Sequence, residues 1–186
     1  MLNTYVVYVE NKPGVLTRVA SLFRRRAFNI DSLTVGRTEK PEVSRMTITV
    51  DADLDQARRI EANLYKLVNV LLVENITAEP TIVRDLAMIK VAATHKARSH
   101  VLELAGVFRG RVVDVAPESL IIEITGDEDK IDGLLEVLQP YGVLEMVRTG
   151  IVAMRRGSKC SAVVSSAHSL SRTTAEDDGD SLEHSV

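Results

Sequence analysis

The chain has 186 residues, of which 45% are hydrophobic and 26% charged, and its formal net charge is −3. This composition is typical of a soluble globular protein of one or two domains, and it gives no global attraction to nucleic acid or to anionic lipid. Aromatic residues make up only 4% of the chain, which disfavours a surface that stacks bases. No apolar stretch approaches the roughly 18 residues that cross a bilayer. The single cysteine, Cys160, fits a reducing compartment, so we expect a cytoplasmic protein, or an organellar one whose targeting segment is missing.

The first part of the chain alternates between two hydrophobic periodicities. Short apolar runs indicate strands, and apolar positions that recur every three or four residues indicate amphipathic helices. Asp53 has the side chain of a helix N-cap and precedes the second helical pattern. In order, we expect a strand at 4–9, a helix after Pro13-Gly14, strands at 30–37 and 45–51, a helix after Asp53 and a strand at 70–76.

The expected strand at 45–51 has the clearest alternation of apolar and polar residues. Three apolar side chains fall on one side, and Thr47 and Thr49 fall on the other. This pattern is typical of a strand with one buried face and one face in water. We therefore expect both threonines on an open sheet face, which lacks the aromatic residues that RNA-binding sheets of this kind carry.

The remainder of the chain, up to about residue 157, repeats the same order of elements. We expect a strand at 85–93, a helix with an apolar face from Val101 to Phe108, strands at 111–116 and 119–125, a helix after Asp127 and a strand at 143–149. This repetition predicts an α+β fold of two tandem ferredoxin-like βαββαβ units, each an antiparallel sheet with two helices on one face. We expect the units at 1–78 and 82–157, joined near Pro80, and a disordered Ser- and Thr-rich tail at 158–186.

Groups that could carry catalysis or bind a metal are scarce. His95 and His100 have no cysteine nearby, and their spacing does not match the i, i+4 pair of a helical metal site. The acidic group at 127–129 and the arginine run at 24–26 fall at the expected start and end of helices, where these charges stabilise the helix macrodipole. We therefore expect no catalytic residues and no bound metal, nucleic acid or membrane.

Gly14 is the least expected residue of the first helical pattern, because glycine in a helix costs about 0.5–1 kcal/mol relative to alanine. In one interpretation Pro13 sets the geometry of the first turn and Gly14 merely follows it. In the other, the first turn presents unpaired N–H groups to a carboxylate, and the missing Cβ lets a ligand or a partner chain approach. Asn11 and Asn29 flank the helix with amides that donate and accept, although Asn29 could equally be a left-handed C-cap.

Several longer segments are recognisable. The first unit contains VENKPGVLTRVASLFRRRAFNIDSLTVG, SRMTITV and KLVNVLLV. The second contains RDLAMIKV, FRGRVVDVAPESLIIEITG and RTGIVAMRRG. Together they resemble the small regulatory subunits of acetolactate synthase, also named acetohydroxyacid synthase, and the first unit resembles an ACT domain. The resemblance covers about residues 2–157, and the tail after Gly157 has no counterpart in it.

The resemblance implies a non-catalytic role. A large catalytic subunit would hold thiamine diphosphate, Mg²⁺ and FAD, and would condense two pyruvates, or pyruvate with 2-ketobutyrate. This chain would carry no cofactor. It would raise the activity of the large subunit and confer feedback inhibition by valine or another branched-chain amino acid, bound between the ACT domains of a homodimer.

The resemblance also assigns an effector site, at Asn11, Gly14, Val15, Leu16, Asn29 and Ile30. Gly14 and neighbouring N–H groups would take the effector carboxylate. The two amides would bind its ammonium group or orient the loop, and the three apolar side chains would line an aliphatic pocket. The expected edge strand at 32–36 would pair with its copy in the partner chain. Ala27 stands where glycine is common in the family.

A second interpretation is a stand-alone tandem-ACT amino-acid sensor that regulates a different enzyme or a repressor. Co-purification of a thiamine-dependent enzyme would favour the regulatory subunit over the sensor. The sequence leaves open which branched-chain amino acid is the effector, because one methylene changes binding by only about 1–3 kcal/mol. It also leaves open the surface that contacts the catalytic subunit, for which the segment at 108–111 is one candidate.

Overall fold

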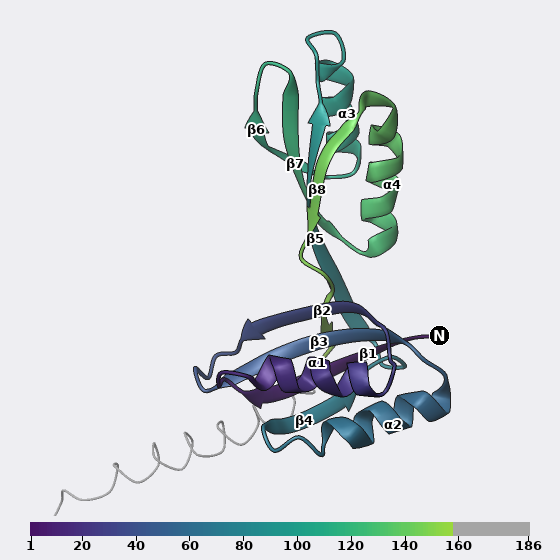
Figure 1. Ribbon diagram of the computed structural model, residues 1–186. Helices are drawn as coiled ribbons and strands as arrows, with labels where there is room; N and C mark the ends of the chain where they lie inside the picture. Colours follow the sequence, from purple (N-terminus) through teal and green to yellow (C-terminus); the bar gives the residue numbers. More distant parts are fainter. Residues whose placement is uncertain (158–186) are drawn as a thin grey trace, which may run out of the picture.

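The computed structural model describes residues 1–157, which form two βαββαβ units (Figure 1). The first unit consists of β1 (Leu2–Glu10), α1 (Val15–Arg25), β2 (Ile30–Arg37), β3 (Val43–Asp51), α2 (Leu54–Leu64) and β4 (Val70–Asn75). The second consists of β5 (Thr81–Ala92), α3 (Arg98–Val107), β6 (Arg111–Val115), β7 (Ser119–Gly126), α4 (Glu128–Leu138), η1 (Gln139–Tyr141), β8 (Val143–Arg148) and β9 (Val152–Arg155). The tail predicted at 158–186, with Cys160, lies outside the described residues.

Both sheets have the strand order of a ferredoxin-like fold. The first runs β2-β3-β1-β4 and the second β6-β7-β5-β8, with every neighbouring pair antiparallel. Two helices cover one face of each sheet (Figure 1). The predicted fold class is therefore confirmed, and β2 lies at an edge of the first sheet. None of the helices in residues 1–157 is long and apolar enough to span a bilayer.

Each unit has its own hydrophobic core between its sheet and its two helices. The buried residues of the second core are all aliphatic, whereas the first core also contains Tyr5, Phe23 and Met46. Asp53 and Asp127 cap α2 and α4 by accepting backbone N–H groups of the first turn, as predicted. Burial of the apolar helix faces, at about 25 cal/mol per Å² of apolar surface, supplies the main stabilisation of each unit.

One strand of the fold was not predicted. β9 pairs with the first four residues of β5, from Thr81 to Arg84, so that β5 is longer than predicted and extends from the second unit toward the first (Figure 1). This two-stranded ribbon packs on the first sheet, on the face opposite α1 and α2. There Ala153 and Val83 join a third cluster that lies over β1 and β4.

The ribbon also changes the environment of β3. Thr47 and Thr49 are 2% and 0% exposed, so the prediction that their side of the strand faces water is wrong. The physical reason is that the covering strand lies far away in the sequence, where no local pattern in β3 can reveal it. Threonine tolerates both environments because its methyl group packs while its hydroxyl finds a partner.

Polar contacts fix the ribbon to the first unit. The Arg155 guanidinium forms ion pairs of 2.8 Å with Glu74 and with Glu79. Just before β9, the N–H of Ile151 donates to Ser32 Oγ on β2 at 3.0 Å. Within the second unit, the N–H of Gly150 donates to the buried carboxylate of Asp85 on β5 at 3.1 Å, which positions the turn before β9. The two units are therefore joined by a packed and hydrogen-bonded contact in addition to the chain itself.

Candidate functional site

Gly14 lies in the turn between β1 and α1, one residue before the helix begins. Its backbone has φ 81° and ψ −6°, in the left-handed region. The expectation that Gly14 sits inside the first helical turn is therefore wrong by one residue. Glycine is favoured here because an L-residue would cost about 1–2 kcal/mol in this conformation. A Cβ built on Gly14 would meet no atom of the described residues within 4 Å, so no part of residues 1–157 fills the space beside the turn.

Helix α1 begins without a side-chain cap. Gly14 offers none, and the first turn contains no acidic residue. The Val15 N–H reaches the Lys12 carbonyl only at 3.4 Å, and no side chain accepts from Leu16 or Thr17. Unpaired N–H groups at the positive end of the helix macrodipole are suited to a carboxylate ligand.

Asn11 fixes this turn to the loop between β2 and β3. Its backbone N–H donates to the Glu42 carbonyl at 2.7 Å, and its side-chain Nδ2 donates to the Pro41 carbonyl at 2.8 Å. The amide nitrogen is thus used within the chain, and the amide oxygen remains as an acceptor. In this geometry Asn11 orients the turn that carries Gly14.

Glu10, at the end of β1, is held by its own partners. The Asn69 amide donates to its carboxylate, and Lys12 Nζ lies 3.1 Å from Oε1. These contacts, with the Asn69 hydrogen bond as the larger cause, lower the pKa of the Glu10 carboxyl. Arg18 of α1 donates to the Asn69 oxygen. The network therefore ties α1 to the residue just before β4 and, through it, to the end of β1. Because Glu10 is engaged there, it does not cap the start of α1.

The other predicted site residues differ in their surroundings. Val15 is 4% exposed and belongs to the first core, whereas Leu16 is 45% exposed beside the turn. Asn29 is exposed and Ile30 half-buried, and both follow the opposite end of α1. The alternative in which Asn29 is a left-handed C-cap is wrong, because Ala27 takes that conformation with φ 55°.

The six predicted effector residues therefore form two groups within one chain. The first group, from Asn11 to Leu16, lies at the N-terminal end of α1, and the second, Asn29 and Ile30, lies beyond its C-terminal end. A helix of this length spans about 16 Å, which is longer than a small amino acid. One chain alone does not bring the two groups together.

The remaining polar candidates do not form a site. His95 and His100 are both exposed. Within residues 1–157, no group of three or more His, Cys, Asp or Glu side chains is arranged to hold a metal ion. The acidic residues at 127–129 begin α4, and Asp127 serves as its cap.

One feature of possible functional use was missed by the sequence reasoning. Arg25 and Arg26, which were attributed to the helix end, line a cavity together with Lys66. The periodicity of each helix shows which face is apolar, but it does not show which parts of two helices meet. No signal in the sequence links residues 25–26 with residue 66, so only the tertiary structure reveals the cavity.

Comparisons with known proteins identify the family. A family model described as an AHAS small subunit-like ACT domain matches residues 6–72, and one described as the small subunit of acetolactate synthase matches residues 84–157. A probable acetolactate synthase small subunit from Archaeoglobus fulgidus is 50% identical over 86% of this chain and 99% of that protein. The chain belongs to the acetolactate synthase small-subunit family. A Mycobacterium leprae member is 49% identical over 84% of this chain and 93% of its own length.

The fold agrees with a solved structure of this small-subunit family. The crystal structure of the acetolactate synthase small subunit from Thermotoga maritima has a TM-score of 0.80 and 40% identity, and the match covers 86% of this chain and 99% of that one. The ACT-domain match at 6–72 contains all six predicted effector residues. The second match ends at Gly157, so residues 158–186 lie beyond both family models.

Proposed function

We propose that this small subunit activates the catalytic subunit of acetolactate synthase and confers feedback inhibition by valine or another branched-chain amino acid. The observation that carries the proposal is the near full-length similarity to proteins named acetolactate synthase small subunit, at 50% identity over 99% of one relative. A small subunit by its name has a larger companion. We expect that companion to hold the thiamine diphosphate, Mg²⁺ and FAD and to perform the chemistry, while this chain binds the effector.

The effector site is proposed to need two copies of the chain. β3 runs antiparallel to both β1 and β2, so β1 and β2 run in the same direction. The end of β2, at Arg37, therefore lies at the same end of the sheet as the Gly14 turn that follows β1. The start of β2, at Ile30, lies at the opposite end. This arrangement explains why Asn29 is distant from Gly14 within one chain.

A homodimer through β2 would bring the two groups together. Two copies of an edge strand related by a two-fold axis must pair antiparallel, so the start of one β2 lies beside the end of the other. The partner's Ile30 then lies near Arg37, at the end of the sheet that carries Gly14. Such pairing would also remove the exposed edge of the first sheet.

In the assembled site each chain has a separate role. The uncapped first turn after Gly14 would bind the effector carboxylate, and Leu16 would contact the aliphatic side chain while Val15 supports it from the core. The partner's Asn29 and Ile30 would complete the site from the other side. Because both chains contact the effector, binding changes how they sit together. A coupling of about 1–3 kcal/mol would change activity roughly 5- to 150-fold.

Substitution of Gly14 tests the carboxylate site. We expect Gly14→Asp to abolish inhibition by valine while activation of the catalytic subunit is retained, because it places a negative charge where the carboxylate would bind. Gly14→Asn is the matched control, since asparagine has the same shape and also tolerates the left-handed region. The measurement is acetolactate formation by the reconstituted enzyme during a valine titration. Full valine sensitivity of Gly14→Asp would refute the assignment.

A mixing experiment tests whether the site is shared between chains. Neither Gly14→Asp nor Asn29→Ala homodimers should respond to valine. A dimer with one chain of each kind would contain one site with both changes and one intact site. Co-expression should therefore restore partial inhibition if the site spans two chains. If the site lay within one chain, both sites of the mixed dimer would be damaged and no inhibition would return.

A further inference from the structure

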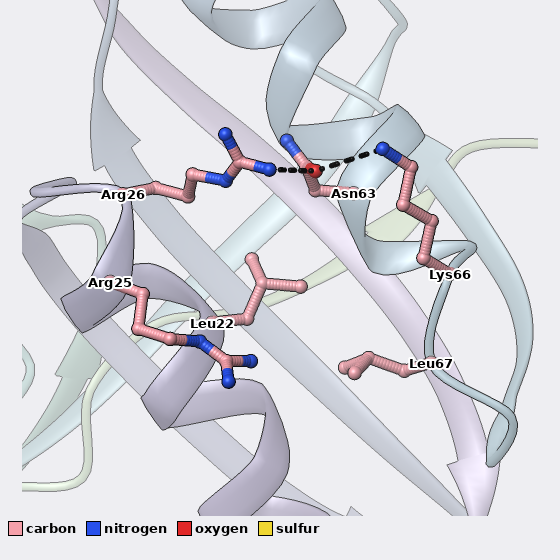
Figure 2. A pocket seen from close by; sticks show the side chains of 6 residues that line it. All are labelled: Leu22, Arg25, Arg26, Asn63, Lys66 and Leu67. Atoms are coloured by element: carbon pink, nitrogen blue, oxygen red, sulfur yellow. Dashed lines mark hydrogen bonds between the residues drawn. The ribbon is translucent and has the colours of Figure 1, made fainter.

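A cavity of about 420 Å³ lies between the C-terminal ends of α1 and α2, at the end of α1 opposite Gly14. Figure 2 shows the side chains that line it. They are Leu22, Arg25, Arg26, Asn63, Lys66 and Leu67. We name this cavity the basic pocket, because its charged lining residues are two arginines and a lysine and none is acidic.

The positive charges of the basic pocket are not neutralised within the described chain. Among residues 1–157, neither of the two arginines nor Lys66 takes part in an ion pair. Arg26 Nη2 and Lys66 Nζ instead both donate to the same neutral acceptor, Asn63 Oδ1, at 3.2 and 3.5 Å (Figure 2). One amide oxygen carries no formal charge, so it compensates neither cation.

Asn63 is fixed in the orientation that holds the two cations. Its side-chain Nδ2 donates to the Arg59 carbonyl one turn earlier in α2, at 2.6 Å, and the residue is only 8% exposed. The amide oxygen must therefore point into the basic pocket. The arrangement holds Arg26, the residue directly after α1, and Lys66, from beyond α2, around a common point.

Stabilisation of the helix ends explains only part of this arrangement. Cations near a helix C-terminus interact favourably with its carbonyl groups, and Arg24 does so as well as Arg25. That effect does not require the cations of two helices to converge on one acceptor. It also does not explain why they surround a cavity whose apolar wall is formed by Leu22 and Leu67. Arg24, in the same last turn, does not line the cavity.

We propose that the basic pocket binds a small oxyanion that carries at least two negative charges, such as a phosphate ester or a polycarboxylate. Guanidinium groups match the oxygens of phosphate and carboxylate with paired hydrogen bonds, and the cavity has the size of small-molecule sites. Leu22 and Leu67 would contact a short carbon skeleton. A zwitterionic amino acid is disfavoured because its ammonium group would approach three cations. The ligand therefore differs from the proposed effector.

Calorimetric titration of the full chain with inorganic phosphate and, separately, with citrate tests this proposal at constant ionic strength. Saturable binding of either anion supports it, and their relative affinities distinguish a phosphate from a carboxylate ligand. The test variant is Arg26→Gln/Lys66→Gln, which removes one cation from each side. We expect affinity to fall by about tenfold or more, as for loss of a hydrogen bond to a charged group.

The matched control is Arg24→Gln/Arg58→Gln, which removes the same charge at positions that are exposed, as Arg26 and Lys66 are, but lie on α1 and α2 outside the basic pocket. Its affinity should stay within about twofold of the unchanged chain, since exposed charges at a distance are screened. In the unchanged chain, the Asn63 side-chain amide resonances should shift with the same midpoint as the heat signal. The proposal is overturned if neither anion saturates, or if both double variants lose affinity equally. It is also overturned if the test variant binds the anion as tightly as the unchanged chain does and loses only its binding to the catalytic subunit.

Discussion

Helices α1 and α3 occupy the same place in the two units, each directly after the first strand, and their C-terminal ends are built alike. Ala27 and Arg109 follow the helices with φ 55° and 56°. In both cases the N–H of the next residue donates to a carbonyl five residues back. The Phe28 N–H donates to the Phe23 carbonyl at 3.1 Å, and the Gly110 N–H donates to the Ala105 carbonyl at 2.7 Å. This is the Schellman arrangement of a helix C-terminus, here with a non-glycine residue in the left-handed position.

The N-terminal ends of the same helices differ. Before α1 the turn at Gly14 is open and uncapped. At the start of α3 the Arg98 guanidinium donates to the carbonyl oxygens of Ala93, Ala116 and Pro117, at 3.1, 2.6 and 2.5 Å. Neither helix has a side-chain cap, so the two ends differ in the open left-handed turn at Gly14 and in the arginine that joins the start of α3 to its neighbouring loops. Two units of one fold can therefore divide their roles, with ligand binding proposed only for the first.

The two sheets also differ in what covers the face opposite the helices. The β5–β9 ribbon packs on this face of the first sheet, where Thr47 and Thr49 are buried. In the second sheet Met88 and Val147 pair on the corresponding face and are 42% and 50% exposed. The first unit therefore depends on the ribbon, and substitutions at the contact should destabilise the first unit more than the second.

The largest effect is expected at Gly150, where the chain enters the ribbon. Its φ is 86°, and a Cβ would lie 2.8 Å from Ser32 Oγ and 3.0 Å from Thr34 Oγ1. Gly150→Ala should lower the free energy of unfolding by about 2–4 kcal/mol, from left-handed strain and from the steric overlap. Urea denaturation at a fixed protein concentration measures the change.

Gly157→Ala separates the two causes. Gly157 has a similar φ of 84°, but a Cβ there would meet no atom of residues 1–157 within 4 Å. Only the backbone strain applies, so a loss of about 1–2 kcal/mol is expected. Equal effects of the two alanine substitutions would show that the contact between the ribbon and β2 contributes nothing, and the proposed dependence of the first unit on the ribbon would have to be abandoned.

A smaller effect, confined to the first unit, should follow from Tyr5. Its hydroxyl donates to the Ala57 carbonyl at 3.1 Å. Burial, and then the charge of Glu61, raise the pKa of Tyr5 from 10.0 to about 12. The ionised form is favoured in the unfolded chain, so the stabilisation is complete below pH 10 and is lost as pH rises toward 12. Allowing for solvent screening, the loss should be about 1–2 kcal/mol.

Comparison with Tyr5→Phe isolates this contribution from other groups that titrate at high pH. The variant lacks the phenol, so its free energy of unfolding should fall less steeply between pH 10 and pH 12. The second core has no buried tyrosine, so no equivalent pH-dependent contribution to the free energy of unfolding is expected from that unit. Parallel pH dependence of the two proteins would show that Tyr5 ionises alike in the folded and unfolded chains.

Periodicity predicted most of the fold because each helix and strand packs mainly on its own unit. It failed where packing partners are distant in the sequence. Thr47 and Thr49 gave a correct strand but a wrong exposed face, since side chains from about a hundred residues away in the sequence pack on this face of the first sheet. β9 itself is only four residues long and has one buried residue, Ala153, so it carried no clear pattern.

The candidate site was predictable where it depends on unusual residues in a local turn. Gly14 was singled out correctly as a residue needing explanation, but its left-handed backbone depends on where the helix begins, which is the least certain feature of a sequence pattern. The separation of Gly14 from Asn29 within one chain follows from the path of α1, which local sequence patterns do not reveal. The basic pocket was invisible because it depends on how two helix ends meet.

The smallest effect is expected at Ala27, in the type of helix C-terminus that occurs in both units. It should be stabilising. In Ala27→Gly, relief of left-handed strain of about 1–2 kcal/mol is offset in part by the greater freedom of glycine in the unfolded chain. We expect a net gain of about 0.5–1 kcal/mol. Ala20→Gly, at an exposed position within α1, is the control and should destabilise by about 1 kcal/mol. If both substitutions destabilised the protein in urea denaturation, Ala27 would not be strained.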